Sequence, residues 1–256
     1  MNENKHVYTF NGYEATVIRP ENPNGKWIWK TEFLTAFDQA ERALVDEGYT
    51  RVYYQISNKY GSPEAVSLME AFYHEVTERY GLDDKCILFG FSRGGLYAFN
   101  FALECPEFVD KVYLDAPVLD LKTWPTKSKN PSEYNGMLAS YGLTEAEFAT
   151  FKGSPVDKLA EFFALGIPLL VVAGDADATV PFEENAGRLI EYALANGHDI
   201  TYVVEAGKDH HPHSLTDVTP RVEFCKRGSY SAVVSNPLEK EDFSGNTITF
   251  LGDSIT

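Results

Sequence analysis

The string GFSRGG at residues 90–95 places one serine, Ser92, between flanking glycines. This G-x-S-x-G spacing is typical of a nucleophile elbow, a sharp strand-to-helix turn that presents a serine hydroxyl above a sheet. Larger side chains at the glycine positions would collide with the adjoining strand and helix. The apolar run 86–89 precedes the string and helically spaced apolar residues follow it. We therefore expect Ser92 to be a nucleophile rather than a simple helix N-cap.

A serine hydroxyl needs a base to take its proton and an acid to orient that base. Two later strings supply such residues, and each follows an apolar run. The first is GDADATVP at 174–181, and the second is EAGKDHHPH at 205–213. Because the carboxyl ends of parallel strands lie at one edge of a sheet, residues far apart in sequence can meet there. The order Ser, Asp, His along the chain matches one of the known serine-hydrolase arrangements.

Each loop offers more than one candidate residue. We expect Asp177 to be the acid, with Asp175 as a competitor that could instead hold its loop through backbone hydrogen bonds. Of the three histidines in the base loop, we expect His210 to be the base and His211 to be the alternative. Asp115, which follows the apolar run 111–114, could supply the acid of a variant triad, although a structural role is favoured.

The elements around these loops predict an α/β fold. Apolar β-rich runs alternate with amphipathic helical stretches, which is typical of a mostly parallel central sheet with helices on both faces. Strands are expected at 13–18, 26–30, 51–56, 86–89, 111–114, 167–173 and 200–204, and helices at 35–47, 63–80, 93–104 and 183–196. The long stretch 119–165 between two strands is expected to form a small cap insertion, with a helical piece at 144–152.

The chain resembles serine esterases of the α/β-hydrolase superfamily. The likeness is to bacterial esterase-like members with an SRGG elbow, a GDADxxVP acid loop and an HHPHSL base loop, which here begin at Ser92, Gly174 and His210. With the segments WIWKTEF and LDAP, it extends from about residue 10 to about residue 230. The resemblance implies the α/β-hydrolase fold and a triad of Ser92, Asp177 and His210. One departure is the approach GKDH to the base, where such esterases tend to carry GxGH.

Ester hydrolysis also needs N–H donors directed at the developing oxyanion. In this fold they are typically the amide after the nucleophile and one from the loop after an early strand. The first position is Arg93, whose side chain is expected to form a structural ion pair. The chain has no HGGG motif, so the second donor is expected near Thr31 or Glu32. Such a triad requires neither a metal nor an organic cofactor.

Composition limits the class of protein further. The 256 residues are 44% hydrophobic, which suits one sizeable domain, here 1–235. A formal charge of -16 disfavours nucleic acid and anionic membranes as partners. The three cysteines, Cys86, Cys105 and Cys225, lack zinc-ligand or disulfide spacing. The first residues have no signal-peptide pattern, so a cytoplasmic protein is expected, whereas a trimmed leader would allow a secreted or periplasmic one.

The last residues carry a second resemblance. The string NTITFLGDSIT at 246–256 is similar to the opening strand and nucleophile block of SGNH, or GDSL, hydrolases, and the polar stretch 236–246 is typical of a linker. We expect 236–256 to be a linker and the truncated first strand of a fused SGNH-like domain in a longer protein. Ser254 should be inert because the later blocks of that family are missing from this chain.

These features predict a serine carboxylesterase that forms an acyl-enzyme. The expected substrates are small-molecule or oligosaccharide esters, with acetyl or hydroxycinnamoyl groups on a carbohydrate. One alternative is a peptidase of the prolyl-oligopeptidase type, which normally carries a propeller domain that this chain lacks. Another is a binding module without catalytic activity, in which the elbow is vestigial.

Overall fold

The computed structural model describes residues 4–227 and 247–250, which form one sheet in the order β1-β2-β4-β3-β5-β6-β7-β8-β9. The first two strands are antiparallel to their neighbours, and the pairs from β3 onward are parallel. The strands are β1 (Asn4–Phe10), β2 (Tyr13–Arg19), β3 (Trp27–Lys30), β4 (Thr50–Tyr54), β5 (Cys86–Phe91), β6 (Val109–Asp115), β7 (Leu169–Gly174), β8 (Thr201–Glu205) and β9 (Thr247–Phe250). The expected mostly parallel sheet is confirmed, with strand ends that agree to within two residues.

Strand β1 was not expected because most of its side chains are exposed and its sequence is polar. Its signal is the dipeptide Asn11-Gly12, which connects β1 to β2 with φ values of 46° and 84°. Positive φ at both central residues is the requirement of the tight hairpin turn that Asn-Gly favours. The edge hairpin is therefore encoded in its turn rather than in an apolar pattern.

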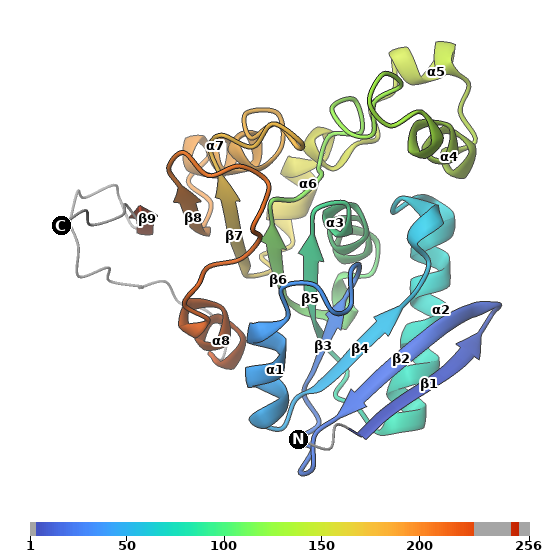
Figure 1. The fold of residues 1–256 in the computed structure, drawn as a ribbon, viewed down its shortest axis with the longest axis vertical. Helices are drawn as coiled ribbons and strands as arrows, with labels where there is room; N and C mark the ends of the chain where they lie inside the picture. Colours follow the sequence, from blue (N-terminus) through green and yellow to red (C-terminus); the bar gives the residue numbers. More distant parts are fainter. Residues whose placement is uncertain (1–3, 228–246, 251–256) are drawn as a thin grey trace.

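The helices cover both faces of the sheet (Figure 1). Helices α1 and α8 lie on one face, and α2, α3, α6 and α7 lie on the other. The helices are α1 (Gln39–Asp46), α2 (Pro63–Tyr80), α3 (Gly94–Glu104), α4 (Pro131–Tyr141), α5 (Glu145–Ala149), α6 (Leu159–Ala164), α7 (Ala186–Ala195) and α8 (Thr219–Lys226). No described helix is both long enough and apolar enough to cross a membrane.

Helix α2 shows how local chemistry sets helix ends. The Ser62 hydroxyl accepts a hydrogen bond from the Ala65 amide, Pro63 occupies the first turn, and Gly81 ends the helix at φ 64°. Helix α1 instead begins four residues later than expected, because Phe37 has a left-handed φ of 50°. The segment 31–38 therefore remains an irregular loop at the carboxyl end of β3.

Each face of the sheet has its own hydrophobic core. In the larger core, Trp27 and Trp29 stack with ring centroids 5.7 Å apart, and each is 1% exposed. Both indole rings therefore contribute to core packing. The cysteines, Cys86, Cys105 and Cys225, are free and buried.

The insertion between β6 and β7 contains α4, α5, the short 3-10 helix η3 (Pro155–Asp157) and α6. Helices α4 and α5 lie beyond the carboxyl ends of β5 and β6 (Figure 1). The Tyr141 hydroxyl donates a hydrogen bond to the Tyr60 carbonyl oxygen at 3.1 Å, which fixes α4 near the loop after β4. This location agrees with a cap, and the capping role itself stays a prediction.

The last described strand, β9, pairs in parallel with β8. The expected linker at 236–246 and the GDS residues, with Ser254, lie outside the described residues. The fused SGNH-like domain therefore stays a prediction.

Candidate active site

Ser92 lies in the turn between β5 and α3 with a left-handed φ of 48°. The residues two positions before and after it, Gly90 and Gly94, must be glycine for steric reasons. A Cβ on Gly90 would lie 2.9 Å from Ala98 Cβ, and a Cβ on Gly94 would lie 2.8 Å from Thr31 Oγ1. The G-x-S-x-G spacing therefore reflects close packing of the turn against β6 and the loop after β3.

The Ser92 hydroxyl contacts the base loop that the sequence indicated. Ser92 Oγ lies 3.0 Å from His210 Nε2, and His210 Nδ1 lies 2.6 Å from Asp177 Oδ2. His210 is 4% exposed and Asp177 is 7% exposed. The structure thus brings the three expected residues together from the ends of three parallel strands. In this geometry an imidazole can take the hydroxyl proton while the carboxylate holds its other N–H.

The two aspartates of the acid loop have different hydrogen-bond partners. Asp177 Oδ1 accepts hydrogen bonds from the amides of Thr179 and Val180 at 2.9 and 2.8 Å, which leaves Oδ2 for His210. Asp175 Oδ1 instead accepts from the Gly207 amide at 2.6 Å. Asp175 therefore has the loop-holding contact that was its alternative role, and Asp177 faces the histidine.

The unusual approach GKDH to the base contributes a further link between the loops. Asp209 Oδ1 accepts hydrogen bonds from the amides of Ala178 and His210 at 2.9 and 2.7 Å. These bonds, that from Ala178 first, lower the pKa of the Asp209 carboxyl. Asp209 therefore fastens the acid loop to the base loop at the residue that precedes the imidazole.

The other two histidines have different surroundings. His211, the alternative base, is exposed and stacks on Phe37, with ring centroids 6.0 Å apart. Partial desolvation and the neighbouring imidazoles of His213 and His210 lower the pKa of His211. Within the described residues, the Ser92 hydroxyl contacts His210 rather than His211. The structure therefore favours His210 for the position of the base.

A second histidine-aspartate pair lies beside the first. His213 Nδ1 lies 3.0 Å from Asp115 Oδ1, and the same carboxylate accepts bonds from the Ser214 amide and hydroxyl and from the Tyr113 hydroxyl. Burial raises the pKa of Asp115, but His213, the Tyr113 hydroxyl and Arg221 together outweigh burial and lower that pKa. The Ser92 amide also donates to the Asp115 carbonyl oxygen at 2.9 Å.

Asp115 therefore connects the elbow to the base loop, as its expected structural role requires. Its carboxylate contacts His213, whereas the histidine that contacts Ser92 pairs with Asp177. Sequence reasoning gave His213 no partner. The available signal was the polar residue at the end of β6, since strand ends at this edge converge.

The oxyanion donors need one correction. The Thr31 amide donates to the Phe89 carbonyl oxygen at 3.0 Å, so it is not free to bind a substrate oxygen. The Glu32 nitrogen lies 3.5 Å from the position of a Cβ on Gly94, beside the elbow. Among the described residues, neither the Glu32 amide nor the Arg93 amide has a hydrogen-bond acceptor. These two amides, near the amino end of α3, are therefore candidate oxyanion donors.

The side chains of the same two residues form a structural pair. Arg93 Nε lies 3.3 Å from Glu32 Oε1, and the Ser57 hydroxyl donates to Glu32 Oε2 at 2.9 Å. The expected ion-pair role of Arg93 is confirmed. The pair connects the elbow with the loop that carries the second candidate donor.

Strained backbone concentrates around the serine. Besides Ser92, Asn11 and Tyr60, the described non-glycine residues with left-handed φ are Phe33, Phe37, Ala116 and Ser214, with values of 56°, 50°, 40° and 70°. All four belong to loops at the carboxyl ends of β3, β6 and β8. Such strain persists only where surrounding contacts enforce it, and it is common at functional sites.

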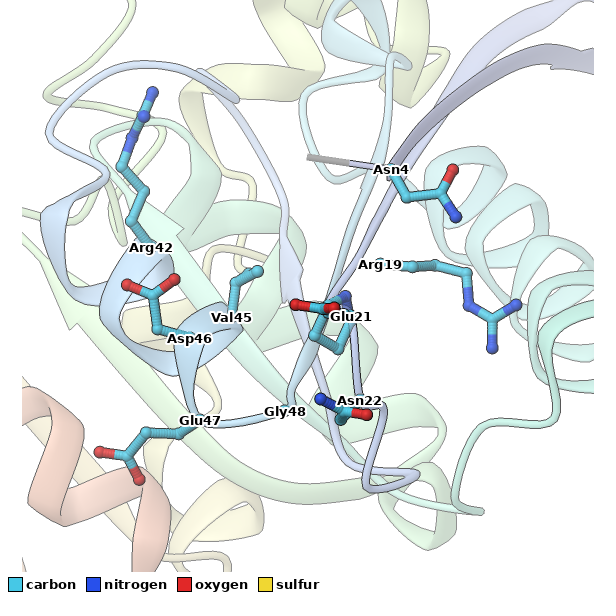
Figure 2. Close-up of a pocket in the computed structure, with 10 residues that line it drawn as sticks. Asn4, Arg19, Glu21, Asn22, Arg42, Val45, Asp46, Glu47 and Gly48 are labelled. Atoms are coloured by element: carbon cyan, nitrogen blue, oxygen red, sulfur yellow. The ribbon is translucent and has the colours of Figure 1, made fainter. Parts of the chain in front are cut away.

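A cavity of about 820 Å³ lies between the end of α1 and the segments that precede β3 and β4 (Figure 2). Its lining mixes acidic, basic and amide side chains: Asn4, Arg19, Pro20, Glu21, Asn22, Arg42, Val45, Asp46, Glu47 and Gly48. Ser92 lies at the carboxyl end of β5, so this cavity does not belong to the candidate active site.

The sheet order, the elbow and the loop arrangement define an α/β-hydrolase of the serine hydrolase class. Within that class, residues 46–227 match the model of the prolyl oligopeptidase family, and the chain belongs to this family. The comparison with curated proteins found no match.

Similar solved structures include two peptidases. Dipeptidyl peptidase 4 of Porphyromonas gingivalis has a TM-score of 0.62 at 14% identity, over 87% of this chain and 35% of that protein. A puromycin-hydrolyzing peptidase of Mycobacterium tuberculosis has a TM-score of 0.63 at 13% identity, over 87% of this chain and 38% of that protein. This chain thus spans little more than a third of either.

A third similar structure is closer to this chain in length. The α/β-hydrolase MGS-MChE2, from the metagenome of sediments of the Mar Chica lagoon, Morocco, has a TM-score of 0.52 at 14% identity. The match covers 80% of this chain and 89% of that protein. At such identities the three structures support the fold alone.

Proposed function

We propose that the chain hydrolyses peptide or related amide bonds, with Ser92 as nucleophile, His210 as general base and Asp177 as the acid that orients His210. The observation that carries this proposal is the unbroken hydrogen-bond series from Ser92 Oγ through the imidazole to Asp177 Oδ2. The left-handed turn holds the hydroxyl at the edge of the sheet where the loops meet.

The proposed reaction uses each of these groups in turn. His210 Nε2 takes the hydroxyl proton as Ser92 Oγ attacks the substrate carbonyl carbon. The carbonyl oxygen becomes an oxyanion and accepts hydrogen bonds from the amides of Arg93 and Glu32. His210 then gives the proton to the leaving amine, and an acyl-enzyme remains. Water, deprotonated by His210, attacks that ester, and the acid product leaves as Ser92 Oγ regains a proton.

Family membership supports peptide bonds as the substrate class. The carbohydrate-ester expectation has no support from the comparisons, whereas the alternative of a peptidase agrees with the family and with the two peptidase structures. A short-chain ester reacts through the same acyl-enzyme, so ester cleavage by itself does not distinguish these substrate classes.

The test compares aminoacyl and dipeptidyl p-nitroanilides with p-nitrophenyl esters from acetate to octanoate. We expect the wild type to cleave the anilides and Ser92→Ala to lose at least about 10⁴-fold in kcat/KM. Ser132→Ala, at an exposed position of α4, is the matched control and should retain full activity.

Other outcomes would each revise the proposal. If the chain cleaves the esters but not the anilides, a carboxylesterase is the better assignment. Activity retained by Ser92→Ala would exclude the triad. A wild type that neither turns over nor reacts with a fluorophosphonate probe would identify a binding module.

A further inference from the structure

The base loop contains three histidines, and the proposed hydrolysis uses only His210. One ring nitrogen from each of His210, His211 and His213 lies within 4.8 Å of the others. His210 and His213 both direct Nδ1 at a buried carboxylate, Asp177 and Asp115 respectively. Histidines that bind metals almost always donate their other ring N–H to such a partner, which orients the ring and raises its basicity.

We propose that His210, His211 and His213 bind a divalent transition-metal ion such as Zn²⁺, and that the bound ion inhibits hydrolysis. Imidazole nitrogen is a preferred ligand of zinc, whereas Mg²⁺ and Ca²⁺ prefer oxygen. The inhibitory part rests on the proposed function, and the binding part does not.

The geometry requires only a modest adjustment. Tetrahedral zinc with bonds of about 2.0 Å places its nitrogen ligands roughly 3.3 Å apart, so the three rings must approach one another. His211 is the exposed member of the cluster, and its ring can rotate without opening the core. Phe37 supports two of the three rings, with centroids 6.0 Å from His211 and 5.2 Å from His213.

Inhibition follows from the nitrogen that the ion would occupy. His210 Nδ1 already contacts Asp177, so the remaining ligand atom is Nε2, which lies 3.0 Å from Ser92 Oγ. One lone pair cannot bind a metal ion and accept the serine proton at the same time. Zn²⁺ at this site would therefore remove the general base reversibly.

Binding is tested on Ser92→Ala protein, which needs no turnover. Calorimetric titration with Zn²⁺ should show one saturable site, and Mg²⁺ should give no comparable heat. In the same background, His211→Ala should weaken Zn²⁺ binding at least about tenfold, because even loss of an outer-shell partner costs that much. His198→Ala, whose ring stacks on Phe163 away from the cluster, should bind as before.

Inhibition is tested on the otherwise wild-type chain with the preferred chromogenic substrate. Zn²⁺ should inhibit hydrolysis and EDTA should restore it. Relative to its own activity without metal, His211→Ala should need at least about tenfold more Zn²⁺ for half-inhibition. Thermal melting, with His211→Gln as a second variant, checks that the loop remains folded.

Absence of a Zn²⁺-specific site in the calorimeter would overturn the proposal. Equal Zn²⁺ sensitivity of wild type and His211→Ala would also overturn it, because the ion would then act elsewhere. If no substrate is turned over, the proposed function fails, and the calorimetric result still decides whether the metal site exists.

Discussion

At the residue scale, two aspartates in one loop have separate contacts. Asp177 accepts two backbone N–H bonds on one oxygen and faces the imidazole of His210 with the other. Asp175, two positions earlier, contacts the Gly207 amide. Asp177 can therefore stabilise an imidazolium, whereas Asp175 acts on the backbone of the base loop.

We predict that Asp177→Asn lowers kcat by about 10⁴-fold while the protein still melts cooperatively. The amide no longer selects the productive His210 tautomer and no longer stabilises the imidazolium. Asp175→Asn is the matched control, because its side-chain oxygen can still accept from Gly207. Steady-state kinetics of both variants decide the point, and equal losses would contradict the assignment of Asp177.

At the element scale, a buried ion pair joins β3 to α1. Lys30 Nζ lies 2.6 Å from Glu41 Oε1, and both side chains are 0% exposed. Lys30 Nζ also donates to the Ala36 carbonyl oxygen, so the pair anchors the loop that leads from β3 past Glu32. Burial lowers the pKa of Lys30, although Glu41 opposes that effect.

We predict that Glu41→Leu lowers the free energy of unfolding by about 3–5 kcal/mol, because the Lys30 ammonium is then buried without a counter-charge. The double variant Lys30→Met/Glu41→Leu should recover most of that loss, since no unpaired charge remains. Urea denaturation measures both. A double variant as unstable as the single one would show that packing, not charge, dominates.

The hydrogen bonds of Asp209 to the acid loop and the base loop predict that the stability of the protein depends on pH. Its folded pKa is lowered, so its contribution to stability is present above the unfolded value of about 3.9 and is lost as pH falls through the folded pKa. The melting temperature of Asp209→Asn should therefore lie below that of the wild type at neutral pH, and the difference should shrink as the pH falls below about 4.

Asp199→Asn, which removes the same formal charge from an exposed residue, controls for net charge in that experiment. Thermal melts from pH 3 to pH 7 provide the measurement. A difference that stays constant across this range would show that the Asp209 charge does not hold the loops together.

At the scale of the whole molecule, the parallel sheet sets the location of the site. One edge of the sheet carries the loops that follow β3, β5, β6, β7 and β8. Helices α4 and α5 lie beyond this edge (Figure 1). The mixed-charge cavity (Figure 2) lies at the opposite edge, because its lining includes Asn22 and Gly48, which precede β3 and β4. The formal charge of -16 predicts that nucleic acid and anionic membranes are not partners, and this stays a prediction.

The sequence by itself determined the central strands, the main helices and the candidate triad. Local patterns carry this information: apolar runs mark the buried strands, and the elbow glycines mark the turn around Ser92. The polar β1 has no apolar pattern and is marked only by the Asn11-Gly12 turn that follows it. In the insertion, α5 lies within the helical piece expected at 144–152, whereas α4 and α6 were not expected.

Only the tertiary structure decided which of several similar residues lie at the site. It paired Asp177 with His210 and Asp115 with His213, and it showed that the Thr31 amide is already bonded to Phe89. Hydrogen bonds act over about 3 Å, and residues adjacent in sequence can point in different directions. Choices between neighbouring aspartates, histidines and amides therefore depend on coordinates rather than on sequence spacing.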